Sequence, residues 1–126
     1  MFGWFNQKST YKKALQIYNL AALGLATYDF FFNPESQYSE VGLDIAVHAM
    51  SFLSLQENSN AVLQFFSSWA NMYRGGAIYA GVTSGCTRVP GVLNGLDALG
   101  HAANGFSIVC SDVEEESNES VAKLKN

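Results

Sequence analysis

The stretch GLDIAVHA at residues 42–49 returns as GLDALGHA at residues 95–102, with Gly, Leu, Asp, His and Ala at the same offsets. The residues in front of each octet also correspond, because ALQIY at 14–18 resembles VLQFF at 62–66. Both matches come in the same order and at similar spacing along the chain. The sequence therefore predicts an internal duplication, in which two copies of one helical hairpin pack about a pseudo-two-fold axis.

The chain divides into four segments with long apolar runs, and the two octets lie in the second and fourth of them. None of the segments shows period-two alternation, which favours helices over strands. Asn33-Pro34 ends the first segment, because a residue before proline is pushed out of the helical region. Ser39 is a residue type that caps the start of a helix, and Pro90 suits the first turn of one. The four helices are expected at about 10–32, 39–56, 60–83 and 89–110.

Short connections between these segments make sequential helices antiparallel neighbours. The expected fold is therefore all-α, a four-helix up-down bundle built from two duplicated hairpins. It forms a single domain over 1–111, with one repeat at about 10–56 and the other at about 60–111. The residues that follow, 112–126, begin with an acidic run and are expected to form a disordered tail.

The chain is poor in charged residues, and this bears on its environment. They make up 14% of the sequence, against about 25% in typical soluble domains. A water-exposed bundle covers its outer faces with Lys and Glu, which this chain lacks over most of its length. Helical glycines are costly in water but let membrane helices pack closely, as in the spacing Gly91-x3-Gly95. We therefore expect a membrane-embedded bundle with the lipid bilayer as its partner.

Lysines lie near both termini, so the positive-inside bias places both ends in the cytosol, with four membrane spans. Two features keep an alternative open: mean hydropathy is only +0.05, and every segment contains polar residues. The alternative is a cytoplasmic, soluble helical interaction or structural module that forms homo- or hetero-oligomers through its apolar faces. The net charge of −4 comes mainly from the acidic tail, so no nucleic-acid partner is expected.

The octets also define a candidate site, because Asp and His four residues apart share one face of a helix. If both faces point inward, two carboxylates and two imidazoles converge near the pseudo-axis. Such a set could bind a divalent metal, hold a haem iron between two histidines, or relay protons, and the cofactor is left unknown among these. The ligand or relay candidates on the two faces are Asp44, His48, Asn94, Asp97, His101 and Asn104, and the metal candidates are Asp44, His48, Asp97 and His101.

Two plainer interpretations compete with a ligand site: an outward polar stripe in water, or an inward layer of Asp–His hydrogen bonds that fixes helix register. The di-iron bundles use a Glu-x-x-His pair, which is not the pattern here. Arg74 is a further candidate, since it lies in an otherwise apolar segment and would pair with Asp29 if their depths match. No nucleophile–base pair is recognisable, so no catalytic residue is assigned. The leading hypothesis is an accessory subunit or small carrier with an Asp/His site between its repeats.

Overall fold

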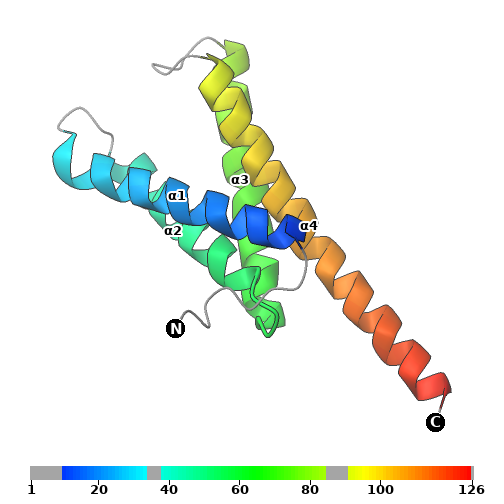
Figure 1. The fold of residues 1–126 in the computed structure, drawn as a ribbon. Coiled ribbons are helices and arrows are strands. Elements are labelled where there is room, and N and C mark those ends of the chain that lie inside the picture. The colour runs from blue at the N-terminus through cyan, green and yellow to red at the C-terminus, as the bar shows by residue number, and fades with distance from the viewer. Residues whose placement is uncertain (1–9, 34–37, 85–90, 126) are drawn as a thin grey trace.

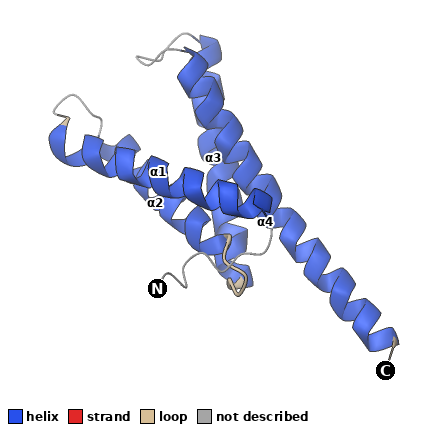
Figure 2. Cartoon of the chain, in the orientation of Figure 1, coloured by secondary structure: helices blue, strands red, loops and turns tan. Residues whose placement is uncertain are grey.

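The computed structural model describes residues 10–33, 38–84 and 91–125, and the regular elements in these ranges are all α-helices (Figure 2). They are α1 (Thr10–Phe32), α2 (Tyr38–Ser54), α3 (Ala61–Ser84) and α4 (Gly91–Leu124). The all-α class expected from the sequence is confirmed, and the first three helices begin and end within two residues of the expected positions.

Local chemistry explains the helix ends that the structure describes. α1 stops at Phe32, directly before the Asn33-Pro34 pair, as predicted. α3 begins after Asn60, whose side-chain oxygen accepts a hydrogen bond of 2.8 Å from the Val62 N–H. That bond satisfies one of the free donors at the start of a helix, so Asn60 is its N-cap. Ser39, in contrast, lies inside α2, so its predicted capping role is wrong.

The largest departure from expectation is the length of α4. A fourth helix ending near Cys110 and a disordered tail over 112–126 were expected, but α4 continues to Leu124. Its C-terminal part projects beyond the other helices (Figure 1). The tail contains four glutamates and two lysines, which have high helix propensity, and extending an existing helix avoids the cost of nucleation.

The helices pair in sequence order: α1 packs on α2 and α3 packs on α4, and the two hairpins meet through α2–α3 and α1–α4. Figure 1 shows the hairpins crossing steeply, in place of the aligned helices of a regular up-down bundle. α3 and α4 approach closely because Gly75 lacks a side chain. A Cβ added there would lie 3.1 Å from the His101 Cβ.

The interior of this bundle is polar. Among the side chains that the structure describes, the buried apolar ones are Leu15, Val47, Phe52, Leu55, Ile78, Ala98 and Ile108. The buried polar ones are more numerous: Gln16, Asn19, His48, Ser51, Ser54, Gln64, Ser67, Ser68, Asn71, His101, Asn104 and Ser107. Large apolar side chains instead face outward on all four helices; Phe31 and Phe106, for example, are 71% and 70% exposed. Soluble monomers show the opposite distribution in their cores.

Across the described ranges, no helix contains a stretch that is both long and apolar enough to span a bilayer. The four membrane spans expected from composition are therefore not supported. The buried polar residues are the physical reason, because they recur along each helix and lower the mean hydropathy of every window. In α3 alone, Gln64, Ser67, Ser68 and Asn71 all face the interior.

Candidate functional site

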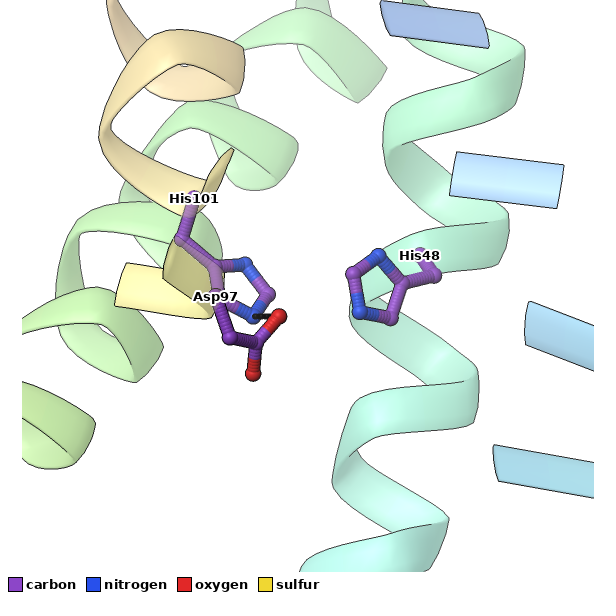
Figure 3. A group of neighbouring side chains, drawn as sticks. All are labelled: His48, Asp97 and His101. Atoms are coloured by element: carbon purple, nitrogen blue, oxygen red, sulfur yellow. Dashed lines mark ion pairs between the residues drawn. The ribbon is translucent and has the colours of Figure 1, made fainter. Parts of the chain in front are cut away.

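Two histidines meet at the place where the hairpins cross. His48 projects from α2 and His101 from α4, and their rings stack with centroids 4.8 Å apart and planes inclined by 27° (Figure 3). Both side chains are buried, at 3% and 0% exposure. The histidines of the two Asp–His faces thus point into the bundle. The interpretation of these faces as an outward polar stripe in water does not fit the two histidines.

Each histidine is held by an asparagine from the other helix of its own hairpin. The Nδ1 of His48 lies 2.9 Å from the Asn19 Oδ1, and the Nδ1 of His101 lies 2.9 Å from the Asn71 Oδ1. The amide groups of both asparagines donate to backbone carbonyls, those of Leu15 and Ser67, each at 2.8 Å. Because this fixes Oδ1 as the atom facing each ring, Nδ1 must carry the proton and donate it. The Nε2 of each neutral ring therefore keeps its lone pair.

Asn104 on α4 connects the two halves of this network. Its Nδ2 donates to the Oδ1 of Asn19 at 2.8 Å and to the Oδ1 of Asn71 at 3.2 Å. Its Oδ1 accepts a hydrogen bond of 2.8 Å from the Asn19 Nδ2. Asn104 was named from the sequence as part of the polar face, and the structure places it between the two asparagines that orient the histidines.

These contacts bear on the predicted duplication. The His–Asn pairs span 29 residues in the first hairpin and 30 in the second, at equal distance and with the same atoms. They make Asn19 the counterpart of Asn71, whereas the sequence match paired Gln16 with Gln64. Gln16 lies three residues before Asn19 but Gln64 seven before Asn71, so that match is displaced by about one helical turn. Apolar helices resemble one another in several registers, and only the buried contacts identify the right one.

Asp97 lies beside the histidines and is held by Tyr18. A carboxylate oxygen of Asp97 lies 3.9 Å from the Nε2 of His101, and the same atom accepts a hydrogen bond of 2.8 Å from the Tyr18 hydroxyl. The Tyr18 ring also meets His48 edge to face, with centroids 5.6 Å apart. Burial, and then the negative charge and hydrogen bond of Asp97, raise the pKa of Tyr18. Gly100 leaves room for this ring, since a Cβ there would collide with it.

Asp44 does not join its counterpart at the histidines. Its carboxylate forms a two-pronged ion pair with Arg74 on α3, in which Nη2 lies 2.9 Å from Oδ2. The expectation of a symmetric set of two aspartates and two histidines is therefore wrong: the group that converges is His48, Asp97 and His101. Arg74 pairs with Asp44 rather than with Asp29. Asn94 belongs to α4, but its side chain lies outside the described part of the structure.

Both histidines are neutral near pH 7. Burial disfavours the charged form and lowers the pKa of His101 to about 4, although the charge of Asp97 opposes this shift. Burial lowers the pKa of His48 in the same way. The Nε2 of His101 has no hydrogen-bond partner among the described residues. A neutral imidazole with a free Nε2 can accept a proton or ligate a metal.

The geometry fits a metal ion better than a haem. Axial histidines of a haem point their nitrogens at the iron from opposite sides. Here the rings stack face to face at 4.8 Å, which leaves no room for a macrocycle between them. The ligand atoms of His48, Asp97 and His101, however, all lie within 4.8 Å of one another. The haem option raised from the sequence therefore does not fit.

Sequence reasoning missed Tyr18, Asn19 and Asn71 as parts of this centre. Their only signal is an amide or phenol among apolar neighbours, and such residues are common on exposed helix faces. The similar sequence spacing of the two His–Asn pairs, 29 and 30 residues, gains its meaning only once the contacts are known. Searches of protein-family models, curated proteins and solved structures find none that matches this chain.

Proposed function

We propose that this chain is a helical interaction module that self-associates through an apolar groove between α3 and α4. The groove has a volume of about 1060 Å³, and glycines form part of its wall, among them Gly76 and Gly95. Large apolar side chains flank them, including Leu99 and Phe106, which are 66% and 70% exposed. Contiguous apolar surface of this kind marks interaction sites on proteins. The observation that carries the proposal is this open apolar groove on a bundle whose interior is polar.

A second copy of the chain is the occupant that the groove favours. A Cβ added at Gly76 or Gly95 would meet no atom within 4 Å, so neither glycine is required by the packing of a single chain. Glycine within a helix costs about 1 kcal/mol relative to alanine, and close approach of another backbone is the usual compensation. A face with a hollow floor and protruding rims complements itself: the rims of one copy, such as Phe106, fill the floor of the other. This is the symmetry of a two-fold dimer.

The buried polar centre supports this function by fixing the groove. Asn71 lines the groove and also holds His101, so the wall of the groove is anchored to the hydrogen-bonded network. Gly75 lies in the same wall and sets the close approach of α3 to α4. Buried side chains that hydrogen-bond one another across helices, as Asn19, Asn71 and Asn104 do, restrict the helices to one arrangement. The network therefore keeps the two sides of the groove at a fixed separation.

Sedimentation velocity on the wild-type chain, Gly76→Leu and Gly24→Leu tests the proposal. Gly24 is the matched control, because it follows Asn19 by five residues as Gly76 follows Asn71, and both have open space for a side chain. We expect the wild type and Gly24→Leu to form dimers at micromolar concentration and Gly76→Leu to remain monomeric. A monomeric wild type, or equal dimerisation of all three proteins, would contradict self-association through this groove.

A second candidate function is a bilayer-associated bundle that acts as an accessory subunit or small carrier, with both termini on the cytosolic side. Its specific support is the apolar surface away from the groove. On α1, Ile17, Leu25, Tyr28 and Phe31 are each more than half exposed. Helices that face lipid carry apolar residues outside and turn polar ones toward each other.

Fractionation of cells without detergent separates the two functions. A module that self-associates is recovered from the soluble fraction as a monodisperse species. A bilayer-associated bundle sediments with membranes, resists a high-pH wash and needs detergent for extraction. Recovery of monodisperse protein from the soluble fraction would eliminate the second candidate.

A further inference from the structure

We propose that His48, Asp97 and His101 bind a divalent transition-metal ion through two imidazole nitrogens and one carboxylate oxygen. The site goes beyond the proposed function, which concerns the outer surface. The three side chains approach from α2 and α4 at the crossing of the hairpins, as Figure 3 shows, and their ligand atoms lie within 4.8 Å of one another. Imidazole and carboxylate ligands together suit zinc, cobalt and ferrous iron.

An unsatisfied atom points independently to a ligand. His101 is fully buried, and its Nε2 has no hydrogen-bond partner among the described residues. The nearest charged group is the carboxylate of Asp97, at 3.9 Å. Because Nδ1 carries the proton of this ring, Nε2 and the carboxylate are both acceptors and cannot bond to each other. A cation between them would satisfy both.

The surroundings of the two rings have the form that metal-binding histidines require. In such sites the nitrogen that does not bind the metal donates its proton to a carbonyl or carboxylate, which fixes the tautomer and the ring orientation. His48 and His101 do this to the side-chain oxygens of Asn19 and Asn71, each at 2.9 Å. Both rings are thus held with the lone pair on Nε2, and the Nε2 of His101 has no partner among the described residues.

A small movement completes the site. Tetrahedral bonds of 2.0–2.1 Å place ligand atoms roughly 3.3 Å apart, so the three atoms, now within 4.8 Å of one another, must approach by up to about 1.5 Å. Asp97 is the member that can move, since its side chain is 35% exposed while that of His101 is fully buried. Tyr18, which donates to Asp97, is a positioning residue for this carboxylate. Asp44 is not available as a fourth ligand because Arg74 holds it, so water completes the coordination.

The full-length chain, stripped with a chelator, is titrated with Co²⁺ under visible absorption and with Zn²⁺ by calorimetry. We expect one ion per chain. Asp97→Asn keeps the shape of the side chain and removes its charge, and should weaken binding at least tenfold. Asp29→Asn, an exposed aspartate outside the site, is the control and should bind as the wild type does. His101→Ala should abolish binding, and Asp97→Asn preserves the test if that variant fails to fold.

X-ray absorption of the zinc complex identifies the ligands directly and separates this site from the acidic C-terminal segment. We expect the outer-shell scattering of two imidazoles. No saturable cobalt spectrum, equal affinities for Asp97→Asn and Asp29→Asn, or an all-oxygen ligand shell would each overturn the proposal.

Discussion

Replacing Asn104 by alanine tests whether the buried network holds the two hairpins together. The side chain is fully buried and takes part in three hydrogen bonds, two to Asn19 and one to Asn71. Alanine removes all three and leaves a small cavity. Asn19 and Asn71 keep their bonds to the histidines and to backbone carbonyls, so no partner is left without any bond.

The expected loss follows from these contacts. Each buried hydrogen bond contributes about 1 kcal/mol net, and the missing side-chain atoms add a cavity term, so Asn104→Ala should lower the free energy of unfolding by about 3–4 kcal/mol. Asn104→Asp has nearly the same volume but sets an acceptor against the oxygens of Asn19 and Asn71. It also buries a charge, and should therefore cost at least as much as alanine.

Urea unfolding followed by circular dichroism at 222 nm measures both variants, with Asn58→Ala, an exposed asparagine in the turn after α2, as the control. We expect the control to stay within about 0.5 kcal/mol of wild type. If Asn104→Asp were as stable as wild type, side-chain volume and not hydrogen bonding would account for the contribution of Asn104 to stability. A loss below about 1 kcal/mol for alanine would show that the network does not hold the hairpins.

Three further predictions concern pH, packing and the C-terminal segment. The pKa of His101 is about 4 in the folded chain and near 6.5 in the unfolded chain, so between these values the unfolded chain binds one more proton. The free energy of unfolding should therefore be at its full value above about pH 6.5 and fall by up to about 1.4 kcal/mol per pH unit toward pH 4. Urea titrations at several pH values measure this. Gly100→Ala should displace Tyr18 and cost about 1–3 kcal/mol, whereas Gly24→Ala, at a helical position with open space around it and outside the groove, should be neutral or stabilising in the same assay. Deleting 112–126 should leave the melting temperature within a few degrees, because this part of α4 projects past the other helices; a large drop would show that it packs elsewhere.

The sequence predicted the parts of this fold that depend on local chemistry and on the repeated octet. Asn33-Pro34 ended α1 at the expected residue, and the octets brought His48 and His101 together. The partners of the histidines could not be predicted from the sequence, because an asparagine in a helix gives the same sequence pattern whether it faces water or an imidazole ring. Asp44 and Asp97 occupy matching positions in the octets, yet only contacts from α3 and α1 decide that one pairs with Arg74 and the other with Tyr18.

The different partners of these two aspartates make the inner surfaces of the two hairpins chemically unequal. Two identical hairpins would give two equivalent carboxylates with identical surroundings. Here one carboxylate pairs with a guanidinium and ties α2 to α3, while the other accepts a hydrogen bond from a phenol and lies beside the two stacked imidazoles. The contrast between Arg74 and Tyr18 therefore gives the two hairpins different inner surfaces: one aspartate joins two helices, and the other lies beside the histidines.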